Sequence, residues 1–100
     1  MTDPPEAAEA PSASLPPMTF GAFVLMLSAS ARVYLGEALA PGAETPAEPD
    51  LELAHQTIDI LEMLEGKTQG NLDSDEEQLL QSVLHDLRMR FVDARDKQKS

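Results

Sequence analysis

Apolar residues recur at the three- and four-residue spacing of α-helices in three separate stretches of the chain. Residues 20–36 form the most apolar stretch, and Arg32 is its one charged residue. Because Thr19 is a good N-cap residue, the pattern predicts a first helix over about 19–39. The residues that share one apolar face of this helix are Phe20, Phe23, Val24, Leu27, Ala31, Tyr34, Leu35 and Ala38, whereas Leu25, Met26 and Val33 lie on other faces.

Two further helices are predicted in the second half of the chain. Asp50 is placed to cap a helix over 51–69, which has a broad apolar face and a wet face of carboxylates. Asp73 and Glu76 have the spacing of a capping box at the start of a helix over 74–97. The link between these two helices is short, which favours an antiparallel hairpin. The sequence therefore predicts an all-α fold of three helices.

Proline marks the segments that lie outside the helices. All eight prolines fall within residues 1–17 and 41–49, and a proline inside a helix removes a hydrogen bond and clashes with the preceding turn. Residues 1–17 are acidic and rich in proline and alanine, which predicts a disordered tail. Residues 40–49 are predicted to be a flexible connector within a single helical domain that spans 18–97.

The first predicted helix is apolar nearly all around its circumference. A helix of this kind is normally buried on most sides, whereas three helices of one chain leave part of each helix in water. We therefore expect self-association into a homo-oligomer, or binding to another protein. A peripheral contact of this helix with a membrane surface is the alternative, but the helix lacks the basic flank that an anionic bilayer attracts. The candidate self-association residues are Phe20, Phe23, Leu25, Met26 and Val33.

The charge of the chain weighs against nucleic acid as a partner. The formal net charge is -11 and the sequence pI is about 4.3, whereas binding to phosphates requires an excess of Lys and Arg. Residues 85–100 are locally basic and are expected to pair with the acids of residues 50–77. We expect Arg32 either to reach solvent along its stem or to meet an acid such as Asp59 or Glu62.

The sequence offers no candidate catalytic, cofactor-binding or metal-binding residue. It contains no cysteine, which excludes disulfides and thiolate metal sites. The Gly-Lys-Thr sequence at 66–68 imitates the end of a phosphate-binding loop, but Leu61 stands where the first glycine of that loop is needed. His55 and Asp59 provide only two metal ligands, so we expect a surface hydrogen bond between them. The chain is predicted to be non-enzymatic.

The sequence favours a soluble cytoplasmic protein. An Ala-Leu-Ala triplet at 38–40 imitates a signal-peptide cleavage site, which keeps export as an alternative. However, residues 1–19 contain three acids and none of the basic residues that a secretory signal needs. The apolar run is interrupted by Arg32 and ends at Gly36, so it is too short for a membrane span.

Several short pieces of the chain together carry a family resemblance. The most specific are Gln56-Thr57-Ile58-Asp59 and Lys67-Thr68-Gln69-Gly70-Asn71-Leu72. Over about residues 18–94 the chain resembles domain-of-unknown-function family eighteen forty-four, a family of small helical bacterial proteins. The resemblance implies a short helical cytoplasmic protein and supplies no activity, cofactor or catalytic residue. Gly66 departs from the longer polar residue expected there, so the end of the second helix is expected to fray.

Overall fold

The computed structural model describes residues 15–99, and three α-helices account for most of them. The helices are α2 (Phe20–Tyr34), α3 (Leu51–Lys67) and α4 (Ser74–Lys99). No strand occurs between residues 15 and 99, so the prediction of an all-α fold with three helices is confirmed. Most of the segment predicted to be a disordered tail, residues 1–14, lies outside the described residues.

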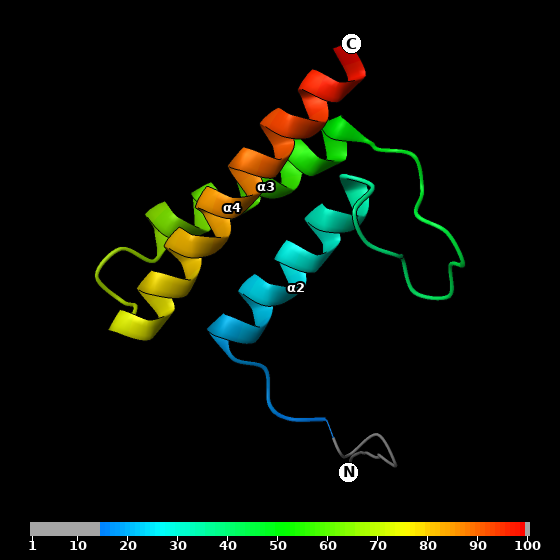
Figure 1. Ribbon diagram of the computed structural model, residues 1–100. Coiled ribbons are helices and arrows are strands. Elements are labelled where there is room, and N and C mark those ends of the chain that lie inside the picture. Colours follow the sequence, from blue (N-terminus) through cyan, green and yellow to red (C-terminus); the bar gives the residue numbers. More distant parts are fainter. Residues whose placement is uncertain (1–14, 100) are drawn as a thin grey trace.

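α3 and α4 lie side by side, and α2 packs against both of them (Figure 1). Gln81, near the start of α4, donates a hydrogen bond to Glu65, near the end of α3. Near the opposite ends of these helices, the rings of His55 and Phe91 are 5.4 Å apart between their centroids. The contacts therefore run in opposite order along α3 and α4.

The hydrophobic core lies where the three helices meet. Each helix contributes buried residues three, four or seven positions apart, so one face of each helix is removed from water. Partly buried aromatic and aliphatic side chains, including Phe20, Leu27, Tyr34 and Phe91, pack around this cluster. The largest fully buried side chains are Val24, Leu61, Leu80, Leu84 and Leu87.

The predicted caps at the helix starts are confirmed. The Thr19 side chain accepts a hydrogen bond of 3.0 Å from a backbone N–H three residues on. The Asp50 carboxylate does the same at 3.1 Å. At the start of α4, Asp73 and Glu76 form the reciprocal capping box, with bonds of 2.8 and 2.9 Å. These side chains satisfy backbone donors that a helix leaves unpaired in its first turn.

The first helix ends earlier than the apolar spacing predicts. α2 ends at Tyr34 rather than near Leu39. Gly36 has a φ of 80°, and its N–H donates a 3.0 Å bond to the carbonyl of Val33. A glycine in the left-handed region is a common helix terminator because other residues pay a steric penalty there. The apolar residues beyond Gly36 therefore belong to the connector.

The other helix ends differ from the predicted ends by two residues each. α3 ends at Lys67, and the Thr68 hydroxyl donates a 2.6 Å bond to the Leu64 carbonyl one turn back. Gly70 also has a positive φ, 83°, and lies in the turn that follows Thr68, the C-cap residue of α3. Gly66 remains within the helix despite the expected fraying.

The two ends of the segment between α2 and α3 contact each other. The backbone N–H of Asp50 donates a 2.7 Å hydrogen bond to the carbonyl of Tyr34. A methyl group placed on Gly36 would lie 3.1 Å from Cγ of Pro49 and 3.3 Å from the carbonyl oxygen of Ala47. The connector therefore leaves and rejoins the bundle at one place, and its middle projects outward (Figure 1).

Replacement of a buried core leucine is expected to be costly. Leu84→Ala leaves a cavity among all three helices, and we expect the free energy of unfolding to fall by about 2–5 kcal/mol. Urea denaturation measures this change. Met89→Ala is the control, because Met89 is 60% exposed on the same helix and should change stability by less than about 0.5 kcal/mol. Equal losses for the two variants would contradict the assigned core.

Gly36 and Gly66 should respond to alanine in opposite directions. Gly36→Ala forces a side chain into a left-handed backbone beside Pro49, and we expect a loss of about 1–2 kcal/mol of unfolding free energy. Gly66→Ala places a methyl group in open space on a helix and should add about 0.5–1 kcal/mol. Thermal unfolding followed by circular dichroism measures both. A stabilising Gly36→Ala would contradict the observed helix end.

Candidate functional site

The side of α2 opposite the core is apolar and exposed. Leu25 and Met26 keep 53% and 55% of their surface accessible, and Met18, just before the helix, keeps 63%. Helical spacing places Leu25 and Met26 on one side of α2 together with small or branched apolar residues, and Met18 adds an exposed apolar side chain before the N-cap Thr19. We call this surface the outer stripe of α2, and it consists of Met18, Ala22, Leu25, Met26, Ala29 and Val33.

The outer stripe follows from an apolar composition that exceeds what one helix can bury. Val24 and Ala31 are seven residues apart and fully buried, which fixes the side of α2 that faces the bundle. A helix of a monomeric protein normally carries polar residues on the other side. Single exposed apolar side chains are ordinary, whereas exposed apolar patches of several neighbouring residues are the kind of surface where proteins meet partners.

The structure brings together some of the predicted self-association residues and separates one. Leu25 and Met26 lie on the outer stripe, and Val33 lies half-buried at its far end. Phe23 is at the edge of the exposed surface. Phe20 packs against the core on the opposite side of the helix.

Three members of the outer stripe were missed by sequence reasoning. Met18, Ala22 and Ala29 were not singled out, because Met18 precedes the N-cap and alanine is common on any helix face. The spacing contains the missing signal: Met18, Ala22 and Met26 follow one another at intervals of four residues. A helical projection that includes small residues would have found them.

Arg32 is exposed beside the outer stripe and forms no ion pair within residues 15–99. The two acids considered as its partners bind other residues. The Nδ1 atom of His55 lies 3.1 Å from a carboxylate oxygen of Asp59, so these two exposed side chains meet as expected, and Glu62 binds Arg88 at 2.7 Å. Arg32 therefore reaches solvent, which is the first of its two expected placements.

Arg90 connects α4 to the segment that follows α2. Its guanidinium donates hydrogen bonds to Asp86 at 2.8 Å and to Glu37 at 2.5 Å. These bonds, that to Asp86 first and that to Glu37 second, raise the pKa of Arg90 above its ordinary value. The bond between Arg88 and Glu62 is of the predicted kind, between the basic segment 85–100 and the acids of residues 50–77. The partners of Arg90 lie outside that acidic segment.

An open hollow of about 800 Å³ lies between the end of α3 and the start of α4. Its walls carry carboxylates, amides and hydroxyls, and the bond between Gln81 and Glu65 occupies part of them. Arg32, His55 and Asp59 do not line it. Across residues 15–99 there is also no group of three acidic, histidine or cysteine side chains that could hold a metal ion. The outer stripe of α2 is therefore the candidate functional site.

The geometry defines a small three-helix protein with one exposed apolar helix face. Residues 17–93 match the family described as domain of unknown function DUF1844, so the chain belongs to this family. The match includes α2, α3 and most of α4. No curated protein and no solved structure matches the chain. Among the helices within residues 15–99, none has the length and apolar character needed to cross a bilayer.

Loss of the Arg90 bonds should weaken the fold modestly. Arg90→Gln removes the contacts to Asp86 and Glu37, and we expect about 0.5–1 kcal/mol less unfolding free energy because the groups are partly exposed. The loss should shrink in about 1 M salt, where charges are screened. Arg95→Gln is the control, since Arg95 lies 3.7 Å from Asp96 on an exposed part of α4. Urea denaturation compares the two variants, and equal losses would contradict the prediction.

Proposed function

We propose that this chain is a non-enzymatic helical interaction module that self-associates through the outer stripe of α2. The observation that carries the proposal is the exposure of Leu25 and Met26 at the middle of an apolar row. A homodimer with twofold symmetry uses the same patch on both chains, so a surface must be compatible with its own copy. An apolar stripe along one helix meets this requirement.

Burial of the outer stripe supplies a driving force. Full burial of a Leu or Met side chain contributes about 1.5–3 kcal/mol, so covering the exposed half of Leu25 or Met26 contributes roughly 1 kcal/mol for each side chain. Each residue counts twice in a symmetric dimer. The two alanines of the stripe, Ala22 and Ala29, leave room for a second helix to approach closely.

Charge favours a second copy at this surface over contacts elsewhere. The chain has a formal net charge of -11, so most approaches of two copies bring carboxylates together. Residues 15–36 contain no acid and one cation, Arg32. Contact through α2 therefore avoids the repulsion that the remaining surface imposes.

We also propose that the protein catalyses no reaction and that it works in the cytoplasm. Catalysis needs polar groups that converge on one point, whereas the acids of α3 and α4 are spread over exposed faces and pair with neighbouring residues. A chain without cysteine needs no oxidising compartment for its stability, which fits the cytoplasm.

Sedimentation tests self-association directly. At roughly 50 micromolar chain we expect the wild type to contain more than one chain per particle. Leu25→Asp should give a folded monomer, because Leu25 is half-exposed in the single chain while its burial in a dimer would bury a charge. Met89→Asp is the matched control, since it adds the same charge at an exposed position of α4 and should leave the particle mass unchanged.

Two outcomes would overturn the proposal. A wild type that is monomeric at this concentration removes self-association. Co-flotation of the wild type with vesicles that contain one quarter of anionic lipid, abolished by Leu25→Asp, assigns the outer stripe to a membrane surface instead.

A further inference from the structure

α2 and α4 lie alongside each other and run in the same direction. A methyl group on Gly21, near the start of α2, would lie 3.4 Å from Leu79, near the start of α4. At the other end, Glu37, just after α2, bonds to Arg90. We call this line of contact the α2–α4 seam, and it runs from Gly21 and Leu79 to Glu37 and Arg90. The direction of the seam determines which charges meet when a second copy binds.

Arg32 lies at the far end of the seam. It follows Gly21 by eleven residues, which is three helical turns, so it is on the same line of α2 that faces the seam. The two carboxylates at this end, those of Asp86 and Glu37, are bound to Arg90. Arg32 is thus a cation beside the outer stripe without a carboxylate from its own described residues.

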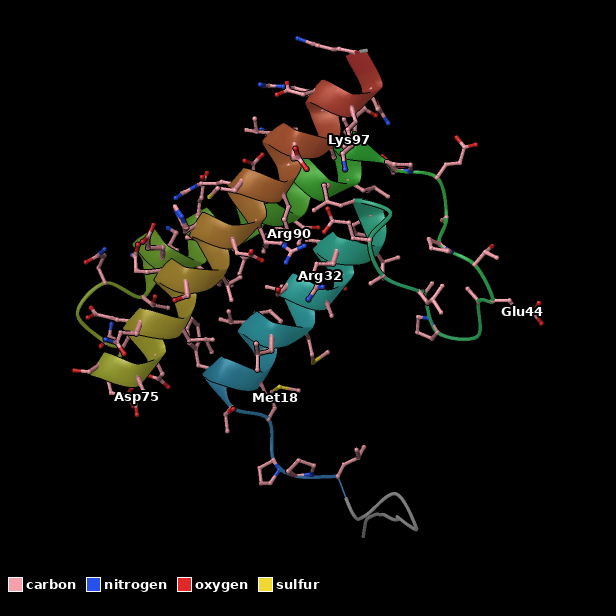
Figure 2. The ribbon with its side chains drawn as sticks, in the orientation of Figure 1. Met18, Arg32, Glu44, Asp75, Arg90 and Lys97 are labelled. Carbon is pink, nitrogen blue, oxygen red and sulfur yellow. The ribbon has the colours of Figure 1, made fainter. Side chains whose placement is uncertain are left out.

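Asp75 lies at the near end of the seam. It precedes Leu79 by one turn of α4 and therefore shares the side of α4 that faces α2. Its neighbours Asp73 and Glu76 are engaged in the capping box, whereas the Asp75 side chain is exposed and forms no hydrogen bond or ion pair within residues 15–99. Figure 2 shows Asp75 at the start of α4, well apart from Arg32 on α2.

Arg32 and Asp75 are too far apart to pair within one chain. Eleven residues at 1.5 Å separate Gly21 from Arg32, and one more turn separates Leu79 from Asp75, so the backbones of the two residues are about 22 Å apart along the seam. An ion pair needs the charged groups within about 4 Å. Arg32 lies beside the outer stripe and Asp75 is exposed at the start of α4, and neither is bound within residues 15–99, so both are available to a second chain.

We infer that two copies pack with their α2 helices antiparallel, about a twofold axis beside Met26, and that Arg32 of each chain pairs with Asp75 of its partner. This inference rests on the proposed self-association. Met26 is at the middle of the outer stripe, so an axis there overlaps the two stripes fully. In the antiparallel arrangement, the far end of the α2–α4 seam, with Arg32, lies beside the near end of the partner's seam, with Asp75. A parallel arrangement brings the two Arg32 cations to the same level, where the nearby carboxylates of Asp86 and Glu37 are already bound to Arg90.

A charge-reversal cycle tests the ion pair. We expect Arg32→Glu and Asp75→Lys each to weaken the dimer about tenfold, since each reversal places like charges together twice in a symmetric dimer. The double variant restores opposite charges and should return the dissociation constant to within about threefold of the wild type. Sedimentation equilibrium at low salt measures all four proteins.

Glu77→Lys is the control for Asp75→Lys. Both positions are in the acidic first turn of α4, so both reversals lose the same favourable interaction with the helix dipole. Glu77 lines the hollow between α3 and α4, away from α2. Its reversal should leave the dissociation constant within about threefold of the wild type. A dimer that weakens equally with Glu77→Lys contradicts the assigned pair.

Single cysteines test the direction of packing independently of charge. The chain has no cysteine of its own, so Met26→Cys and Met18→Cys each introduce one thiol. Antiparallel packing brings Met26→Cys against its copy. The first residue of α2, Phe20, would already lie about 18 Å from its copy, so two Met18→Cys thiols beyond the helix starts are out of reach of a disulfide. We expect a covalent dimer on a non-reducing gel for Met26→Cys alone.

The outcomes separate the inference from the proposal on which it rests. Linkage at Met18→Cys, or at neither position, overturns the antiparallel arrangement while the dimer itself stands. A dimer that Leu25→Asp dissociates but that ignores both charge reversals overturns the ion pair only. A wild type that sediments as a monomer overturns both the inference and the proposed function.

Discussion

Val24 and Ala31 bury one side of α2 against the other helices, and this one-sided packing determines the character of the remaining surface. Because α2 is joined to α3 by a long connector, its place in the bundle depends on this contact and on the closed base of the connector. The buried side uses only part of the apolar residues that α2 carries. What is left forms the outer stripe, so the same composition that holds α2 in the fold also leaves its far side apolar and exposed.

The charged residues are unevenly distributed among the three helices. α3 and α4 carry the acids of the three helices, and two cations of α4, Arg88 and Arg90, are bound by acids of the same chain. α2 contributes one cation and no acid. An acidic protein keeps its copies apart by repulsion over most of its surface, and here the apolar helix is the part where that repulsion is weakest. Apolar exposure and charge depletion coincide on α2, although either could occur alone.

Most of the fold could be predicted from the sequence because its signals are local. Thr19, Asp50 and the capping box at the start of α4 act within four residues, and the buried positions follow helical spacing. The end of α2 was mispredicted because spacing ignores the backbone conformation that Gly36 adopts. The exposure of Leu25 also follows from spacing. The position of Arg32 along the α2–α4 seam could not be predicted, since it depends on which helices are neighbours and on their relative direction.

The closed base of the connector has a consequence for how the chain tolerates change in length. Asp50 is hydrogen-bonded to Tyr34, and Pro49 lies against Gly36, so the ends of the connector are fixed by local contacts. Residues between these ends, such as Gly42, have open space around them. Extra residues inserted there would lengthen only the projecting part of the connector, whose two ends are already held together. The entropic cost of closing a loop grows slowly with its length. The tip of this projecting part is therefore the natural place for insertions, epitope tags or fused domains that leave the helices undisturbed.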